Sequence, residues 1–570
     1  MNNAEAFVIY LREKCNVTDS FGLPGGVVLR LIDNFYFYNQ DNSCHLMYHE
    51  QAASFAAIGY ALSSNKLGVA YATKGPGILN MVTAIAEAYQ ESVPVLFITS
   101  YSNKNDDRTR FEHNQEVDIV ACVKHFTKYA DYIDTEEEFI PKVINACNKA
   151  LQGRKGPVLL NINSKLWIKD VLSYDECLLS NCCSTEKFLG TDYFQIDNIV
   201  NEVNSFISES KRPVILIGDG IRQADAIDEL CSCLKDMNIP VLSSRGAQGI
   251  YTNNSNYFGY IGSHGCRYSN QILSKADSLI VLGNRLAFPI NSQSFRPVVE
   301  NKKIIRIDID DKEFSREIPN AKNYCIDVKE FLKKFNLNNS IRENFHTEWL
   351  QVCNEIKSKL LNSDVLEPVE ELKNLLCNIS DVTIVCDVGN NEFWTARTYE
   401  LVRPKAGIVY SKSFGTLGSA LCKAIGVYYA TKKPVVVISG DQGIQFNIQE
   451  LHYISQWKLP ITVVVLNNNC SAMIKDHEQK MCLRNLVHVT PDSGYSSPNF
   501  EAIAISYGFC YLNNERNDLS KDFKITSEPL FVEIKYKAEY ELVPYLEKGK
   551  SCEDMSPLLD RSLLSYLHSL

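Results

Sequence analysis

A carboxylate and a carboxamide stand at the ends of two strand-like runs in the C-terminal third of the chain. The run Pro434 to Ser439 breaks into Gly440-Asp441-Gln442-Gly443, and some two dozen residues later the run Ile461 to Leu466 ends in Asn467-Asn468-Asn469. Side-chain oxygens of these types suit Mg²⁺, and glycine turns expose main-chain N–H groups that can hold phosphates. The intervening length allows one helical crossover and a return strand. The pair therefore predicts a site for a magnesium-bound diphosphate.

A second constellation lies near the N-terminus. His49-Glu50-Gln51 opens a helical pattern after the apolar residues Leu46 to Tyr48. A carboxylate at a strand-to-helix junction lies at the rim of a sheet, where α/β proteins bind ligands, although it could instead merely favour the first helical turn. Two glycine-rich loops predicted at the same rim, Phe21 to Gly26 and Thr73 to Gly77, favour the ligand site.

Short β-rich runs alternate with longer helical patterns, which predicts an α/β fold of three doubly wound parallel-sheet domains. A chain of 570 residues is also too long for a single core. We expect domains over residues 1–165, 193–331 and 365–545, followed by a tail over 546–570. Residues 166–192 read as a linker, and a charged, Asn-rich stretch over 332–364 separates the last two domains. The predicted strands cover 67–71, 93–99, 158–162, 213–217, 239–242, 279–282, 304–307, 382–386, 408–410, 435–438, 462–466 and 530–534.

The amino-acid composition favours a globular protein and argues against nucleic-acid-binding and membrane-spanning classes. Hydrophobic residues at 45% and charged residues at 22% are ordinary for a globular protein, and a net charge of −10 argues against a nucleic-acid partner. No apolar run approaches the roughly 18 residues of a membrane span, and the N-terminus lacks the pattern of a signal peptide. The 19 cysteines are odd in number, scattered and without zinc-site spacing, so we expect reduced thiols in a cytoplasmic protein that binds no membrane.

Five motifs in register resemble thiamine-diphosphate-dependent enzymes of the acetohydroxyacid synthase-like branch. They are Phe21 to Val28, His49 to Tyr60, Gly75-Pro76-Gly77, the pair from Gly440 to Asn468, and Asn447 to Leu451. They occur in the family's order and at compatible spacings over nearly the whole chain. The resemblance implies a pyrimidine-binding N-terminal domain, a nucleotide-binding-like central domain and a diphosphate-binding C-terminal domain.

The resemblance also implies roles for individual residues. Glu50 would meet the aminopyrimidine ring and thereby promote loss of the proton from the thiazolium C2. Asp441, Asn468 and the main-chain carbonyl of Cys470 would bind Mg²⁺. Leu417 would bend the cofactor, its alternative being an ordinary core leucine. The other cofactor-binding residues implied are Gly25, Gly75, Pro76, Gly77, Gln115, Gly389, Asn390, Asn391, Gly415, Gly440, Gln442, Gly443 and Met473.

The central block carries loops in the order seen in flavin-carrying members of the family. By this resemblance Gly262, His264 and Gly283 would cradle FAD, Arg285 would pair with its phosphate, and Asp308 would bind ribose hydroxyls. The alternative is a vestigial domain that packs without a nucleotide, and His264 could equally be a packed loop residue. The flavin's role could be structural rather than redox.

Several positions depart from the family pattern. Gln442 replaces a glycine, and Lys74 stands where small residues are usual, either as a cation near the substrate or as a solvated lysine. Pro289, in Leu286-Ala287-Phe288-Pro289, replaces the arginine that grips the acceptor's carboxylate in true synthases. His477 replaces a tryptophan of the acceptor pocket, whereas Gln115-Glu116 matches the family. The donor half of the reaction therefore looks preserved and the acceptor half changed.

These departures leave three functions open. The leading one is a carboligase that decarboxylates pyruvate or a related 2-oxo acid and passes the acyl unit to a carbonyl acceptor. A keto-sugar acceptor is suggested by the short stretch Cys552 to Leu558, which resembles enzymes of surface-polysaccharide pathways. The alternatives are a simple 2-oxo acid decarboxylase and a catalytically silent cofactor-binding subunit. The family's shared site implies a homodimer or homotetramer.

Overall fold

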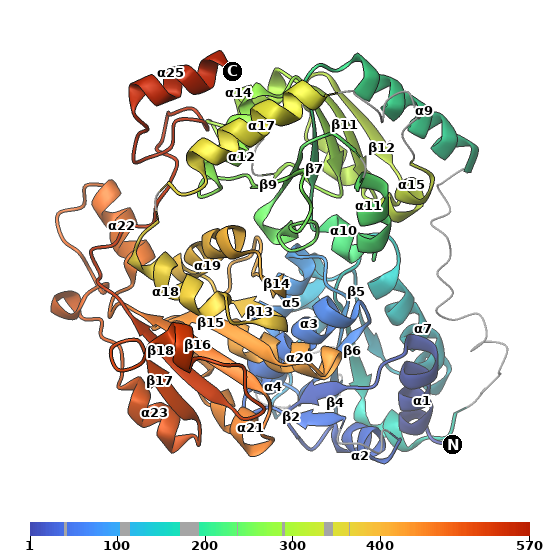
Figure 1. Ribbon diagram of the computed structural model, residues 1–570. Coiled ribbons are helices and arrows are strands. Elements are labelled where there is room, and N and C mark those ends of the chain that lie inside the picture. The colour runs from blue at the N-terminus through green and yellow to red at the C-terminus, as the bar shows by residue number, and fades with distance from the viewer. Residues whose placement is uncertain are drawn as a thin grey trace.

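The computed structural model describes residues 1–38, 43–102, 114–171, 193–235, 237–287, 291–335, 346–363 and 365–570. These residues form three six-stranded sheets with helices packed around them (Figure 1). Every pairing between neighbouring strands is parallel. The predicted α/β fold of three parallel sheets is thus confirmed, while the exact limits of the domains stay predictions.

The first sheet has the strand order β2-β1-β3-β4-β6-β5. Its strands are β1 (Ser20–Gly22), β2 (Cys44–Leu46), β3 (Gly68–Tyr71), β4 (Val95–Tyr101), β5 (Tyr129–Ile133) and β6 (Val158–Asn163). Its helices are α1 (Asn3–Cys15), α2 (Leu29–Tyr38), α3 (Glu50–Ser64), α4 (Pro76–Asn80), α5 (Val82–Gln90), α6 (Ile119–Val123) and α7 (Glu136–Leu151).

The second sheet has the order β12-β11-β10-β7-β8-β9. Its strands are β7 (Pro213–Ile217), β8 (Val241–Ser243), β9 (Tyr257–Tyr260), β10 (Ser278–Leu282), β11 (Lys303–Asp308) and β12 (Ala321–Cys325). Around it lie α9 (Tyr193–Glu209), α10 (Gly220–Gln223), α11 (Ile227–Leu234), α12 (Arg267–Lys275), α14 (Arg296–Glu300), α15 (Val328–Lys334) and α17 (Thr347–Leu360).

The third sheet has the order β14-β13-β15-β16-β18-β17. Its strands are β13 (Ser380–Cys386), β14 (Lys405–Val409), β15 (Val435–Gly440), β16 (Ile461–Asn467), β17 (Cys510–Asn513) and β18 (Leu530–Lys535). Its helices are α18 (Glu367–Leu376), α19 (Asn390–Val402), α20 (Ala420–Thr431), α21 (Glu450–Gln456), α22 (Ala472–Lys480), α23 (Phe500–Ser506) and α24 (Leu519–Asp522).

Two glycines bring the first and third domains together. Gly59 of α3 lies against the backbone of Lys423 in α20, and Gly426 of α20 lies against the backbone of Ala56. A Cβ atom at either glycine would overlap main-chain atoms of the other helix, so only glycine permits this close crossing. The crossing places α3 and α20 side by side in the middle of the molecule (Figure 1).

The structure adds detail to the two segments between the predicted domains. The linker was expected from residue 166, but Trp167 is 1% exposed and its ring packs edge-on against Phe7 and Phe139, so the first domain continues beyond it. The stretch 332–364 contains α17, whose buried residues Trp349 and Cys353 pack in one core with the central sheet. Its helical apolar spacing is masked in the sequence by intervening charges.

The tail docks on the central domain. It ends in α25 (Arg561–Ser569), which lies close to α17 in Figure 1. The buried Arg267 of α12 donates to the main-chain oxygens of Met555 and Pro557, both at 2.7 Å, and Leu546 N–H donates to Ser263 O at 2.9 Å. The chain end is therefore an integral part of the central fold.

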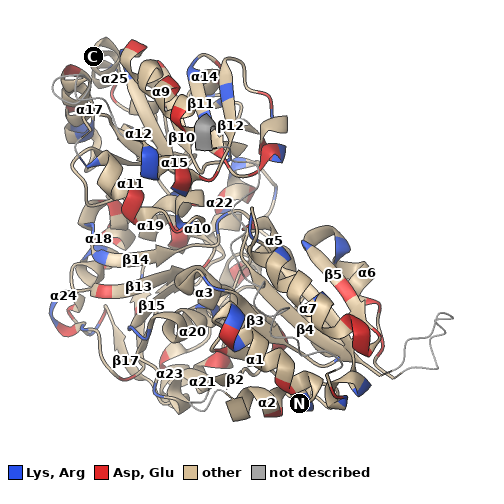
Figure 2. Ribbon diagram, turned by 90° about the vertical axis from the view of Figure 1, so that its right-hand side faces the viewer, with Lys and Arg blue, Asp and Glu red and all other residues tan. Residues whose placement is uncertain are grey.

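The charged residues, the cysteines and the helix lengths can be compared with the expectations drawn from composition. Acidic and basic segments are interspersed rather than gathered by sign in the view of Figure 2. All cysteines within the described ranges are free thiols. Within those ranges, every helix falls short of the length and apolar character that spanning a membrane requires.

Candidate active site

Asp441 and Asn468 lie at the same edge of the third sheet. They directly follow β15 and β16, which are paired neighbours with Gly440 opposite Leu466. Both side chains are buried, and Asp441 Oδ2 and Asn468 Nδ2 have no hydrogen-bond partner among the described residues. Burial raises the pKa of Asp441 to about 7. Unpartnered buried polar atoms are costly, so this pair fits a metal ion and the groups that the metal carries.

Cys470 contributes main-chain groups to this pair. Its carbonyl oxygen accepts the N–H of Ala472 at 2.8 Å, and its main-chain N–H lowers the pKa of the nearby Asp441 carboxyl, against the larger effect of burial. A carbonyl oxygen keeps a second lone pair after accepting one bond. The predicted role of this oxygen as a metal ligand is compatible with the geometry and stays a prediction.

The turn after β15 explains one departure and adds a residue that the sequence did not reveal. Gln442 has φ −79°, an ordinary conformation, so replacing glycine there causes no backbone strain. Gly443, in contrast, is required, because a Cβ atom would overlap Asp387 Oδ2. The buried Asp387 accepts hydrogen bonds from Gly418 N at 2.9 Å and from Ser439 Oγ at 3.0 Å. Asp387 thus ties together three predicted cofactor loops.

In the neighbouring loop from Gly389 to Asn391, the asparagine side chains bond to the protein and the glycine begins a helix. Asn391 Nδ2 donates to Asp387 O at 2.7 Å and to Ile438 O at 3.4 Å, so this side chain braces β13 and β15. Asn390 Nδ2 lies 3.4 Å from Asp476 Oδ2 on α22. Gly389 has φ +128°, which only glycine adopts readily, at the start of α19. The loop therefore offers main-chain N–H groups at a helix N-terminus.

The remaining predicted residues of this half lie around the same edge. Gly415 has φ +73° in the loop before α20, and the half-buried Leu417 lies outside the hydrophobic cores of the described residues. This position disfavours the alternative of an ordinary core leucine. Met473 is half-buried on α22, whereas His477 of the same helix is exposed.

Glu50 is the first residue of α3 and is 8% exposed. Asn80 Nδ2 of α4 donates to its Oε2 at 2.9 Å. Gly77 lies beside its other oxygen, since a Cβ atom there would be 3.2 Å from Oε1. The Gly75-Pro76-Gly77 turn and Glu50 are therefore brought together as predicted, and a carboxylate with one fixed and one accessible oxygen results.

Two further loops close around this turn. A Cβ atom on Gly25 would overlap the Thr73 side chain, and one on Gly75, which has φ +63°, would overlap Gln115 O. The loops after β1, β3 and β4 therefore touch one another here. Gly25 and Gln115 accordingly lie against the turn that carries Gly77, and their predicted role in binding the cofactor stays a prediction.

Glu450 is a residue that sequence analysis quoted within a motif without assigning a role. Its Oε1 accepts Tyr48 N–H at 3.0 Å, so a helix of the third domain holds the segment that leads into Glu50. Burial raises the pKa of Glu450 to about 8, countered by hydrogen bonds from Tyr48 and His49 main-chain groups. No chemistry-bearing spacing marks such a contact, since its partners are 402 residues apart.

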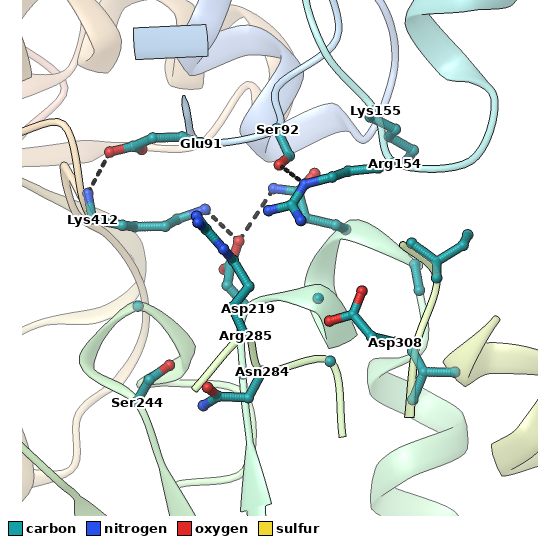
Figure 3. A pocket seen from close by; sticks show the side chains of 18 of the residues that line it. Glu91, Ser92, Arg154, Lys155, Asp219, Ser244, Asn284, Arg285, Asp308 and Lys412 are labelled. Atoms are coloured by element: carbon teal, nitrogen blue, oxygen red, sulfur yellow. Dashed lines mark hydrogen bonds and ion pairs between the residues drawn. The ribbon is translucent and has the colours of Figure 1, made fainter. Parts of the chain in front are cut away.

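A cavity of about 980 Å³ lies between the central domain and the other two. Glu91, Ser92 and Arg154 of the first domain, Asp219, Arg285 and Asp308 of the second, and Lys412 of the third point toward it (Figure 3). All five residues predicted to bind FAD line it, namely Gly262, His264, Gly283, Arg285 and Asp308. The volume is at the upper end of the range typical for ligand pockets.

Some polar side chains that line the cavity already form hydrogen bonds or ion pairs within the protein. Arg285 Nε forms an ion pair with Glu313 at 3.0 Å, and Asp308 Oδ1 accepts Asp310 N–H at 3.1 Å. Burial raises the pKa of Asp308. Burial lowers the pKa of His264 to about 4, so its ring is neutral near pH 7, where it packs against Phe393 at 4.5 Å. The cavity thus offers glycine turns, several cationic side chains and carboxylate acceptors to a nucleotide. Phe288 and Pro289, which the sequence analysis compared with the acceptor-binding residues of true synthases, lie outside the described residues.

Three family models match the chain in sequence order. They are the thiamine pyrophosphate enzyme N-terminal TPP binding domain over residues 1–122, the central domain over 200–335 and the C-terminal TPP binding domain over 387–534. The acetolactate synthase large subunit of Lactococcus lactis subsp. lactis (strain IL1403) is 30% identical over 564 residues, which cover 96% of this chain and 95% of that protein.

Two further relatives show the same pattern. The acetolactate synthase large subunit of Cyanidium caldarium is 28% identical over 569 residues, covering 95% of this chain and 94% of the relative. A probable acetolactate synthase large subunit of Methanococcus aeolicus is 29% identical over 570 residues, covering 94% and 92%. Three matched domains and a full-length relative agree with the geometry of the two half-sites. The chain belongs to the thiamine pyrophosphate enzyme family, in its acetolactate synthase-like branch.

Proposed function

We propose that the protein removes CO₂ from pyruvate or a related 2-oxo acid and transfers the acyl unit to a carbonyl acceptor other than a simple keto acid. Thiamine diphosphate, when bound, supplies the electron sink for the pair released with CO₂. The observation that carries the proposal has two parts. Asp441 Oδ2 and Asn468 Nδ2, which have no partner among the described residues, lie at one sheet edge, and a buried, oriented Glu50 lies at another.

Glu50 is the proposed proton-handling group of the reaction. Asn80 occupies its Oε2, which leaves Oε1 beside Gly77, where a missing side chain gives a ring nitrogen room to approach. A carboxyl group positioned to exchange a proton in this way contributes roughly 10²–10⁴-fold to a reaction rate. Glu50→Gln keeps the shape and the Asn80 contact but removes the exchangeable proton.

Asp441, Asn468 and the Cys470 carbonyl are the proposed ligands of Mg²⁺. Three protein oxygens leave positions in an octahedron for the diphosphate and water. The main-chain N–H groups of the turn at Gly443 and of the start of α19 would bind the diphosphate oxygens. Asp387 would hold these loops at the spacing that the diphosphate requires.

A second copy of the chain is proposed to complete the site. Large apolar side chains next to predicted cofactor residues are exposed in a single chain: Tyr48 at 38%, Phe414 at 42%, Phe446 at 54% and Ile474 at 50%. Exposed apolar groups gathered around a site favour coverage by another protein surface. A homodimer or homotetramer would provide it, and sedimentation velocity would measure which one forms.

FAD is the proposed occupant of the 980 Å³ cavity. Asp308 has a buried acceptor for ribose hydroxyls, and the close contact between Gly218 and the Gly283 carbonyl leaves the ends of β7 and β10 bare of side chains where a diphosphate would pass. Purified protein that shows no flavin absorbance, even after FAD is added and unbound FAD removed, would refute this assignment.

A nucleotide-linked keto sugar is the proposed acceptor, supported by the resemblance of Cys552 to Leu558 and by the absence of the acceptor-binding residues at positions 289 and 477. The test is incubation with pyruvate, thiamine diphosphate and Mg²⁺, with and without such a sugar. A carboligase forms a branched sugar only when the acceptor is present. Free acetaldehyde as the sole product in both arms would instead identify a decarboxylase, and an inactive protein would identify a silent subunit.

A further inference from the structure

We infer that Lys74 binds the carboxylate of the 2-oxo acid substrate, and that Glu116 holds its ammonium group in position. The inference rests on the proposed function and adds to it the residue that selects an anionic donor. It replaces the view of Lys74 as a solvated surface lysine.

The first argument is location. Lys74 precedes Gly75 in the turn after β3, and Gly77 of that turn lies beside Glu50 Oε1. Strands β1, β3 and β4 are neighbours in the first sheet, so the loops that follow them share one edge with the proposed proton-handling group. A group at Lys74 therefore lies at the rim where substrate must meet the cofactor.

The second argument is the way the ammonium is held. Lys74 Nζ donates to Glu116 Oε1 at 2.7 Å and to Ser102 Oγ at 3.0 Å. Ser102 N–H donates to the same Glu116 oxygen at 3.0 Å. The Lys74 side chain is only 15% exposed, so it is not a freely solvated lysine. These two bonds fix the ammonium in place, and an ammonium carries three donors, so one N–H has no partner among the described residues.

The third argument is charge. A 2-oxo acid is an anion at neutral pH, and the protein carries a net charge of −10. In the described parts of the loops that follow β1 to β4, Lys74 is the one lysine or arginine. A half-buried cation interacts more strongly with an anion than an exposed one, because water screens it less. Among the described residues of this rim, Lys74 is therefore the one that can attract the substrate's carboxylate.

The test compares two probes of nearly equal shape and different charge. Methyl acetylphosphonate is a monoanion that resembles pyruvate, and dimethyl acetylphosphonate is its neutral diester. Each is titrated calorimetrically into protein loaded with thiamine diphosphate and Mg²⁺. We compare the wild type with Lys74→Met, Lys74→Arg and Glu116→Gln. Lys142→Met is the matched control, since Lys142 is another paired lysine of this domain, 3.1 Å from Asp131 and 23% exposed.

Loss of a hydrogen bond between charged groups weakens binding by about 10- to 100-fold. We expect Lys74→Met to weaken binding of the monoanion by that factor and of the diester by less than about twofold. Lys74→Arg keeps the charge and is expected to retain most of the monoanion affinity. Glu116→Gln removes a competing anion and is expected to bind the monoanion at least as tightly as the wild type.

Equal losses for both probes would show that Lys74 only supports the fold, and unchanged binding of the monoanion would show that it does not meet the substrate. Either result overturns the inference. A wild type that binds the monoanion in a Lys74-dependent way but releases no CO₂ from pyruvate would support the inference while contradicting the proposed turnover. Should Lys74→Met not fold, the comparison of Lys74→Arg with Glu116→Gln still decides the question.

Discussion

The buried carboxyl of Glu450 predicts an unusual dependence of stability on pH. Its pKa is about 8 in the folded protein against a reference value of 4.5. Between these pH values the unfolded chain ionises Glu450 while the folded chain keeps it protonated. The folded state then binds more protons, so the free energy of unfolding falls as pH rises, by about 1.4 kcal/mol per pH unit from this group.

The change that isolates this effect is Glu450→Gln. Glutamine cannot ionise, and its amide oxygen can still accept the N–H of Tyr48. We expect the variant and the wild type to be similarly stable near pH 5 and the variant to be more stable at pH 8, by up to about 4 kcal/mol. The assay is urea unfolding at four pH values from 5 to 8, followed by tryptophan fluorescence.

A control is needed because other groups also titrate over this range. Glu501→Gln removes a carboxylate paired with Arg516, and the hydrogen bond from that arginine lowers the pKa of Glu501, in contrast to the raised pKa of Glu450. This control should show no gain that grows with pH. The reasoning is refuted if Glu450→Gln is less stable than the wild type at pH 8, or if their difference does not change with pH.

Three further outcomes follow from buried contacts. Lys423→Met leaves Glu87 as an uncompensated buried charge, so we expect the free energy of unfolding, measured in urea, to fall by about 3–5 kcal/mol. Adding Glu87→Leu removes that charge and should restore much of the stability. No recovery in the double variant would contradict this account. Gly443→Ala should weaken thiamine diphosphate binding by at least about tenfold in calorimetry, because the methyl group displaces Asp387 and the loops that Asp387 holds. An unchanged affinity would argue against the role of Asp387 in positioning these loops. Asp308→Asn should weaken FAD binding by about tenfold, measured by quenching of flavin fluorescence, and equal affinity would place the ribose elsewhere.

The central strands and the principal site residues could be predicted from sequence for one physical reason. Strands such as β15 and β16 are buried on both faces and so read as continuous apolar runs, and residues that follow parallel strands share one sheet edge. The edge strand β14 was predicted over 408–410, but the edge strands β2 and β12 were missed, because β2 has three residues and β12 only partly buried or exposed ones. Such segments lack the apolar signal on which the prediction depends.

Contacts between distant segments could not be predicted. Asp387 and Glu450 act through main-chain N–H groups, which carry no sequence signature, and the cavity between domains draws Glu91 and Lys412 from opposite ends of the chain. Lys74 was noticed only as a departure from a pattern, and its partner Glu116 emerged from the fold. Functional residues at strand ends can thus be identified from the sequence, whereas the partners that orient them can be identified only from the folded structure.

The docked chain end has a practical consequence for handling the protein. Arg212 donates to the carbonyl of Leu570 at 3.1 Å, and Arg267 relies on two carbonyls of the preceding stretch. A protease cut near residue 550 would disturb the carbonyl partners of Arg267 and the bond from Leu546 N–H to Ser263 O, which support the Gly262–Gly265 loop and the start of α12. A preparation cut in this way should therefore bind the proposed FAD more weakly than the intact chain, and a missing yellow colour in it would reflect the cut rather than the enzyme.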